Sequence, residues 1–373
     1  MVTETNDWYL VDGIDQLDSP ALIVYPARVL ENIRTLKNMI DDPNRLRPHA
    51  KTHKTKAATQ LLIKEGINKF KCATIAEAEM LAICDARDVL LAYQPVGPKV
   101  DRLYELVKKY KGTQFSCLID NITAARVIAN VFSSNGLTIK VYLDLDIGQG
   151  RTGINPDATA IQLYMDCSQL KGIQLAGFHA YDGHIHDADF IKRKNRCDES
   201  FAAVEKLKVI LMEMGFAEPL IIAGGTPTFS IHCKRQKIEC SPGTFIYWDK
   251  GYLEICKEQN FIPAAIVITR VISLPGKNRV CLDLGHKSIA AENELTRRVY
   301  FLNAPDFKAI SQSEEHLVVE VENANQFKIG DIFYGLPIHI CPTCALYEKA
   351  YTIENRKITG QWEMIARDRM ITV

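Results

Sequence analysis

The feature that most limits the fold of this chain is the alternation of short apolar runs with longer amphipathic runs through its first two thirds. Eight runs rich in β-branched and other apolar residues predict strands, at residues 46–52, 70–75, 89–93, 115–120, 140–147, 175–181, 220–223 and 237–240. Several of them are almost continuously apolar, which is expected of parallel strands that are covered on both faces.

The amphipathic runs between these strands predict helices. Helical patterns cover residues 27–40, 76–86 and 189–214, and the first of them places four apolar residues on one face: Val29, Ile33, Leu36 and Ile40. Eight strand–helix units predict a (β/α)8 TIM-type barrel. An open doubly wound sheet is the alternative, but such a sheet usually carries Gly-x-Gly-x-x-Gly after its first strand, and this sequence has none there.

The pattern changes near Phe261, where helical periods give way to short strand-like runs separated by Gly, Asn and Asp turns. The 373 residues are also too many for one ordinary domain. We therefore expect a barrel over residues 18–260 and an all-β domain over residues 261–373. The N-terminal segment, residues 1–17, is expected to pack with the β domain.

Composition excludes several classes of function. Lys plus Arg equals Asp plus Glu, at 45 each, so neither a nucleic-acid-binding surface nor a polybasic membrane patch is expected. No stretch approaches the ~18 apolar residues of a membrane span. The N-terminus does not read as a secretion signal, so we expect a cytoplasmic protein whose eleven cysteines are mostly reduced and buried.

The densest group of chemically active residues is RPHAKTHK, from Arg47 to Lys54, at the end of the first predicted strand. In a barrel, the carboxyl ends of the strands face the active site. A lysine there, such as Lys51, can form a Schiff base with a carbonyl compound. The alternative is that Lys51, Lys54 and Lys56 form a solvated basic edge.

Three further segments follow later predicted strands. Asp146 to Gly153 contains Arg151, which could equally be a surface arginine in a glycine-rich turn. Residues 177–187 crowd three histidines and two aspartates at one strand end, where a polar loop without a metal is the simpler reading. After the seventh strand, Gly224-Gly225-Thr226 exposes backbone N–H groups that suit a phosphate.

In the β domain, His339 and Cys341 are expected on the same face of a strand, where they could be two ligands of a metal. Spacing alone supports this only weakly, because zinc sites need three or four ligands. Cys341 also forms the only Cys-x-x-Cys pair, with Cys344, whose role is open.

Taken together and in order, these motifs resemble those of the D-threonine aldolase and D-serine dehydratase family, which are fold-type III pyridoxal-phosphate enzymes and distant relatives of alanine racemase. The motifs that carry the resemblance are RPHAKTHK, DIGQGRTG, YDGHIH, GGTP, SPGT, HIC and QWEMIARDR. The resemblance covers nearly the whole chain.

The resemblance implies a role for each motif. Lys51 would hold pyridoxal phosphate, and either His184 or His186 would act as a base. The other cofactor-binding residues would be Arg151, Tyr181, Gly224, Gly225, Thr226 and Tyr247. His339 and Cys341 would hold a divalent metal, Zn²⁺ or Mn²⁺.

The implied function is a lyase for small D-amino acids that carry a β-hydroxyl group. The paired histidines favour aldolase cleavage to glycine and an aldehyde. The alternative is a D-serine or D-3-hydroxyaspartate dehydratase that releases a keto acid and ammonia. An amino acid racemase and a non-catalytic cofactor-binding protein are further alternatives. The family resemblance also implies a homodimer.

Overall fold

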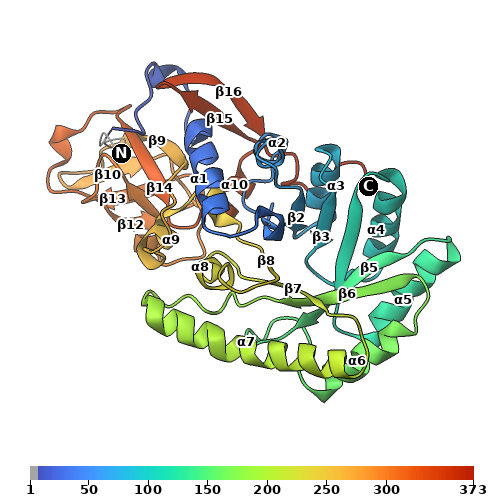
Figure 1. Cartoon of the computed structure of the whole chain (residues 1–373). Coiled ribbons are helices and arrows are strands. Elements are labelled where there is room, and N and C mark those ends of the chain that lie inside the picture. Colours follow the sequence, from blue (N-terminus) through green and yellow to red (C-terminus); the bar gives the residue numbers. More distant parts are fainter. Residues whose placement is uncertain (1–6) are drawn as a thin grey trace.

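The computed structural model describes residues 7–373, which form a barrel and a β domain joined by one continuous core (Figure 1). The barrel contains seven parallel strands in sequence order: β2 (Lys69–Cys72), β3 (Asp88–Leu91), β4 (Gln114–Ile119), β5 (Ile139–Leu145), β6 (Ile173–Ala180), β7 (Leu220–Ala223) and β8 (Ile238–Cys240). This architecture confirms the TIM-type barrel predicted from the alternating pattern.

The first predicted strand, residues 46–52, is wrong. Residues 46–52 form no strand and contribute only two isolated bridges, Leu46 to Cys240 of β8 and His49 to Lys71 of β2. The segment thus lies between the first and last strands of the barrel sheet. It cannot continue as a strand because Pro48 has no N–H to donate and the chain turns at residues 50–53.

Helices alternate with the barrel strands along the chain, and the predicted helices are confirmed. They are α1 (Pro26–Asn38), α2 (Lys56–Lys64), α3 (Ile75–Ile83), α4 (Pro98–Lys109), α5 (Ile122–Ser134), α6 (Ala158–Ser168), α7 (Phe190–Glu213), α8 (Phe229–His232) and α9 (Lys250–Ile255). In α1, the buried residues include Val29, Ile33 and Leu36. Helix α7 begins where Asp189 accepts a hydrogen bond from the Lys192 N–H at 2.8 Å.

The second sheet has nine strands. They are β1 (Ala21–Val24), β9 (Ala265–Ser273), β10 (Arg279–Leu282), β11 (Val299–Phe301), β12 (Lys308–Gln312), β13 (Leu317–Glu320), β14 (Ile332–Pro337), β15 (Lys349–Glu354) and β16 (Lys357–Glu363). Strand β1 lies between β9 and β15, antiparallel to the first and parallel to the second. The sequence assigned residues 21–24 to the barrel, whereas their partners are strands of the C-terminal sheet.

The segment before β1 packs on the same sheet. Tyr9, Val11 and Leu17 are buried in a cluster with Ile266 and Tyr334. Residues 1–6 lie outside the described residues. Five short 3-10 helices complete the element order, at Ile14–Gln16, Pro43–Arg45, Thr244–Ile246, Leu295–Arg297 and Ala324–Gln326.

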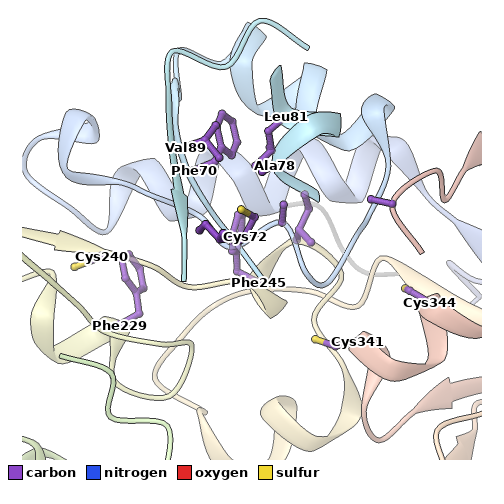
Figure 2. Packing of buried hydrophobic residues seen from close by; sticks show 14 of the residues in the cluster. Phe70, Cys72, Ala78, Leu81, Val89, Phe229, Cys240, Phe245, Cys341 and Cys344 are labelled. Carbon is purple, nitrogen blue, oxygen red and sulfur yellow. The ribbon is translucent and has the colours of Figure 1, made fainter. Parts of the chain in front are cut away.

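The β domain contains one helix that the sequence did not predict. Strand β14 ends at Pro337, His339 is the residue before helix α10, and α10 spans Ile340–Leu346. The prediction that His339 and Cys341 share one face of a strand is therefore wrong. Pro342 lies in the first turn of α10, where its missing N–H breaks no intrahelical hydrogen bond. Figure 2 shows Cys341 and Cys344 on this helix, beside the barrel residues of the core.

Two expectations from composition can be compared with the structure. All eleven cysteines are unpaired and buried, as expected. In residues 7–373, no helix has both the length and the apolar content needed to cross a membrane.

Candidate active site

A small cavity of about 40 Å³ lies where the barrel loops meet helix α10. Its walls come from the turn after the bridging segment, the end of β6, the loops after β7 and β8, helix α9 and the start of α10. The lining residues are His49, Lys51, Tyr181, Gly225, Thr226, Ser241, Gly243, Thr244, Tyr252, His339 and Cys341. The cavity thus brings the predicted Schiff-base lysine and the predicted metal pair together.

Lys51 differs from its two neighbouring lysines in where its amine lies. Lys51 lines the cavity, whereas Lys54 forms an ion pair with the buried Glu77, and Lys56 is exposed at the start of α2. The Lys51 N–H donates to Nδ1 of His49 at 3.2 Å. Burial, with help from the charges of Lys51 and Lys71, holds the pKa of His49 well below its ordinary value, so this imidazole is neutral.

The loops after β7 and β8 form a cradle with room for an oxyanion. Gly224 has φ +73°, and a Cβ on Gly225 would lie 2.8 Å from Cε2 of Tyr181, so glycine is required at both positions. The Thr226 hydroxyl accepts the N–H groups of Gly243 and Thr244, each at 3.2 Å. The Ser241 hydroxyl is buried in the cavity wall without a hydrogen-bond partner. A phosphate group fits this donor set.

The end of β6 forms a second side of the site. Nδ1 of His179 lies 2.7 Å from the Asp144 carboxylate, and the Thr152 hydroxyl donates to the same carboxylate at 2.8 Å. The Tyr181 ring lies parallel to the His179 ring, with 6.3 Å between their centroids. The predicted Arg151 lies with its guanidinium 5.2 Å from the Tyr181 centroid, beside the cavity rather than in its wall.

His339 and Cys341 present one nitrogen and one sulfur to the cavity. Nδ1 of His339 is 2.5 Å from Oε1 of Glu292, which leaves Nε2 for a metal and orients the ring, as a carboxylate does for metal-binding histidines. Sγ of Cys341 lies 3.0 Å from the Thr52 hydroxyl and 3.5 Å from the Thr244 hydroxyl, and it also interacts with the His339 side chain.

The electrostatics of the pair favour a thiolate. Burial acts against a charged thiol, but His339 and Lys51 lower the pKa of Cys341 below its ordinary value. Burial also acts against a charged imidazole, yet Cys341, Asp249 and Glu292 raise the pKa of His339 to about 9. A divalent cation would replace the proton between the two side chains, so this donor set fits a metal.

Five predicted residues lie outside the cavity wall: Arg151, Gly224, His184, His186 and Tyr247. His186 is exposed, and the ring of His184 packs on Gly148 with its Nδ1 buried and unpartnered. Tyr247 is fully buried in the core, and its hydroxyl has no hydrogen-bond partner among the described residues. The structure places Tyr252 in the cavity wall instead.

A separate cluster of potential metal ligands lies behind the glycine-rich loop. Ligand atoms of Asp182, Cys197 and His232 lie within 4.8 Å of one another, and all three residues are buried. Asp182 accepts hydrogen bonds from the Thr228 hydroxyl at 2.7 Å and is 2.8 Å from Nε2 of His232. These contacts satisfy the carboxylate without a metal and tie β6 to the loop after β7.

Sequence reasoning missed several residues of this region, among them His49, Lys71, Ser241 and Tyr252. His49 and Ser241 belong to motifs that the sequence singled out, RPHAKTHK and SPGT, so motif membership was an available signal. Lys71 and Tyr252 carry no such signal, because only the closure of the barrel and the start of α9 bring them to the site.

The chain matches known proteins over most of its length. Residues 24–250 match the family model of the alanine racemase N-terminal domain, and residues 264–353 match that of a serine dehydratase domain. The chain is 27% identical to a D-threonine aldolase of an Arthrobacter species, over 95% of this chain and 94% of that one. It is 21% identical to the D-threo-3-hydroxyaspartate dehydratase of a Delftia species, over 95% and 99% of the two chains.

The fold has a solved counterpart. The crystal structure of a D-threonine aldolase from Filomicrobium marinum superposes with a TM-score of 0.87 at 24% identity, covering 96% of this chain and 98% of that one. Aldolases and dehydratases of this kind are lyases. The chain therefore belongs to the alanine racemase N-terminal domain family, as an enzyme that joins this barrel to a serine dehydratase domain, like the lyases it resembles.

Proposed function

We propose that the protein is a lyase that uses pyridoxal phosphate and a divalent metal to cleave D-amino acids bearing a β-hydroxyl group, with glycine and an aldehyde as products. One observation carries this proposal: Lys51 lines the same cavity as His339 and Cys341. An amine that can form a Schiff base thus lies beside a nitrogen and a sulfur that can bind a metal.

The residues that would hold each group follow from the cavity wall. Lys51 would bind the cofactor covalently, and the Ser241 hydroxyl with the Gly225–Thr226 loop would bind its phosphate. Pyridoxal phosphate supplies an electron sink for the bond that breaks. Nε2 of His339 and Sγ of Cys341 would hold Zn²⁺ or Mn²⁺, which acidifies a bound hydroxyl group. A variant of D-threo-3-hydroxyaspartate dehydratase has been solved in a metal-free form, which supports a metal site in relatives.

Aldolase cleavage needs a group that takes the proton of the β-hydroxyl. Of the two predicted bases, His184 is the stronger candidate, because its Nδ1 is buried without a partner, whereas His186 is exposed. His184 packs on Gly148, in the loop that also carries Arg151. Its role as the base stays a prediction.

Dehydration is the second candidate, and Tyr252 favours it. Burial raises the pKa of this phenol well above its ordinary value, and its hydroxyl has no hydrogen-bond partner in residues 7–373. A protonated phenol in the wall beside Cys341 can donate a proton to a departing hydroxyl group. Lys51 would then take the α-proton. The serine dehydratase domain match over residues 264–353 is compatible with this second candidate.

One assay separates the candidates. The purified protein is loaded with pyridoxal phosphate and Mn²⁺ or Zn²⁺ and offered D-threonine, D-serine and D-3-hydroxyaspartate, with glycine and keto acid both measured. Glycine without keto acid supports the aldolase, and the reverse supports the dehydratase. The proposal is wrong if neither product forms, or if a chelator leaves the rate unchanged.

A further inference from the structure

Lys71 is a buried amine with no carboxylate partner. It lies on β2, and its side chain is almost fully buried, with 3% relative exposure. Among residues 7–373, no carboxylate oxygen lies within ion-pair distance of its Nζ, and its nearest polar contact is Nε2 of His179 at 3.5 Å. A buried charge without a partner is costly, so an amine of this kind points to a missing anion.

A second unpaired cation lies close by. The Nζ of Lys71 is 5.0 Å from the centroid of the Tyr181 ring, and Cζ of Arg151 is 5.2 Å from the same centroid. Arg151 also forms no ion pair in the described part of the chain. Arg151 is exposed, so water partly screens its charge, and an anion near both cations would offset the repulsion that remains.

The nearby carboxylates are already engaged. Asp144 is held by Nδ1 of His179 and by the Thr152 hydroxyl. Asp182 is held by the Thr228 hydroxyl and by His232. Both carboxylates raise the pKa of Lys71 through their charge, but each is already held by other hydrogen-bond partners and neither pairs with Lys71.

Lys71 also lies next to the Schiff-base segment. Its carbonyl accepts the N–H of Ala50 at 2.8 Å, and the bridge between β2 and His49 fixes this register. Burial, followed by the charge of Lys51, lowers the pKa of Lys71 to about 7. The carboxylates of Asp182 and Asp144 act to raise this pKa, whereas the charge of Arg151 lowers it further. The other titratable groups that face it are His49, His179 and Tyr181.

We propose that Lys71, beside Arg151, binds an anionic oxygen group in the cofactor site. This inference rests on the proposed function, which supplies two anions of suitable chemistry: the deprotonated phenol oxygen of pyridoxal phosphate and the carboxylate of the amino acid substrate. Either would form a charge-assisted hydrogen bond with Lys71 and offset its repulsion with Arg151.

The test compares ligands that differ by one oxyanion. The cofactor-free protein is titrated with pyridoxal phosphate and with 3-deoxypyridoxal phosphate, which lacks the phenol oxygen. The holoenzyme is titrated by absorbance with D-threonine and with D-threoninol, which lacks the carboxylate. Each titration is done on the wild type, Lys71→Met, Lys71→Arg and the control Lys69→Met. Lys69 lies on the same strand but pairs with Glu239, outside the cavity.

We expect Lys71→Met to weaken one member of a pair by about tenfold or more and to leave the oxyanion-free member unchanged, as for the loss of a charge-assisted hydrogen bond. A selective loss for pyridoxal phosphate assigns Lys71 to the phenol oxygen, and a selective loss for D-threonine assigns it to the carboxylate. Lys71→Arg should retain most of the affinity, and Lys69→Met should behave as the wild type.

Two results would overturn the inference: affinities within twofold of the wild type for all four ligands, or equal losses for both members of each pair. Equal losses of affinity for both ligands of a pair would identify a general effect on folding, because the two ligands differ only in the oxyanion. The wild type keeps the two proposals apart. If the wild type does not bind pyridoxal phosphate at all, the proposed function fails. If the wild type binds the cofactor and Lys71→Met changes none of the affinities, only this inference fails.

Discussion

At the scale of single residues, the surroundings of each side chain decide its chemistry more than its identity does. Three lysines lie within six positions of one another, yet one lines the cavity, one pairs with Glu77 and one is exposed. The same holds for Tyr247 and Tyr252, which are five positions apart. Tyr247 is fully buried in the core, and Tyr252 lies in the cavity wall.

Lys51 should carry the cofactor. Borohydride reduction of the holoenzyme followed by peptide mapping should label Lys51, because it is the lysine of this segment whose side chain lines the cavity. The peptides that contain Lys54 and Lys56 are internal controls. Label on either of them would contradict the assignment.

His339→Ala should lower lyase turnover by at least about 100-fold, because the metal would lose one of its two protein ligands. The absorbance of the bound cofactor should stay intact, since Lys51 and the phosphate cradle lie on the barrel. His316→Ala, at an exposed position of the same domain, is the matched control. Chelation should cause the same loss of turnover in the wild type. Added metal should restore turnover in the chelated wild type but not in His339→Ala. Full activity of the variant would refute the metal site.

Gly225→Ala should weaken cofactor binding by about tenfold or more, because the new Cβ would lie 2.8 Å from the Tyr181 ring and would force the loop or the ring to move. Gly112→Ala is the control, since a Cβ there meets nothing within 4 Å. Binding is measured by titration of the cofactor-free proteins. Equal affinities of the two variants would show that the loop does not contact the phosphate.

At the scale of elements, one buried carboxylate joins the C-terminal segment to the barrel. Glu79 of α3 accepts the N–H groups of Thr372 and Val373, at 2.9 and 3.1 Å, and the Tyr110 hydroxyl at 2.9 Å. In Figure 1 the C-terminal end lies beside α3 and α4. Burial acts against the charge, but these hydrogen bonds, with those of the Thr372 hydroxyl and Lys109, lower the pKa of Glu79 to about 2.

The stability that Glu79 contributes should therefore depend on pH. Since its pKa is lowered in the folded chain, this contribution is present above the ordinary pKa of a glutamate, ~4.3, and is lost as the pH falls toward 2. Glu79→Gln should expose the amides of Thr372 and Val373 to hydrogen exchange at neutral pH, with Glu105→Gln on exposed α4 surface as the control. Unchanged protection of these amides would show that the segment is held by other contacts.

At the scale of the whole molecule, the β domain closes the barrel of its own chain. His339 and Cys341 start helix α10, and both face a cavity whose other walls are barrel loops. The core is continuous between the two parts and includes Cys341, so packing holds the start of α10 against the barrel. One chain thus supplies both the predicted Schiff-base lysine and the predicted metal ligands.

The protein should also form a homodimer, as its family resemblance implies. Light scattering at micromolar concentration should give twice the 42.0 kDa mass of one chain. The fully active enzyme should sediment as the same species. A monomer with full activity would contradict the prediction.

The sequence by itself determined the class of fold, most of the helices and strands, and the motifs that lie around the cavity. These follow from local chemistry: apolar periodicity selects strand or helix, and glycine-rich turns follow the barrel strands. Motifs singled out Lys51, Gly225, Thr226, His339 and Cys341, and the family resemblance implied their roles. The structure brings all five into one cavity wall.

Only the tertiary structure decided what depends on contacts between distant segments. Residues 46–52 form bridges in place of a strand, β1 joins the C-terminal sheet, and residues 340–346 form a helix. Tyr252 and Lys71 reach the site, and Tyr247 does not, because side-chain direction depends on how each element packs. Periodicity within a segment reports its own apolar face, but not which distant segment will cover that face, and so it cannot place these residues.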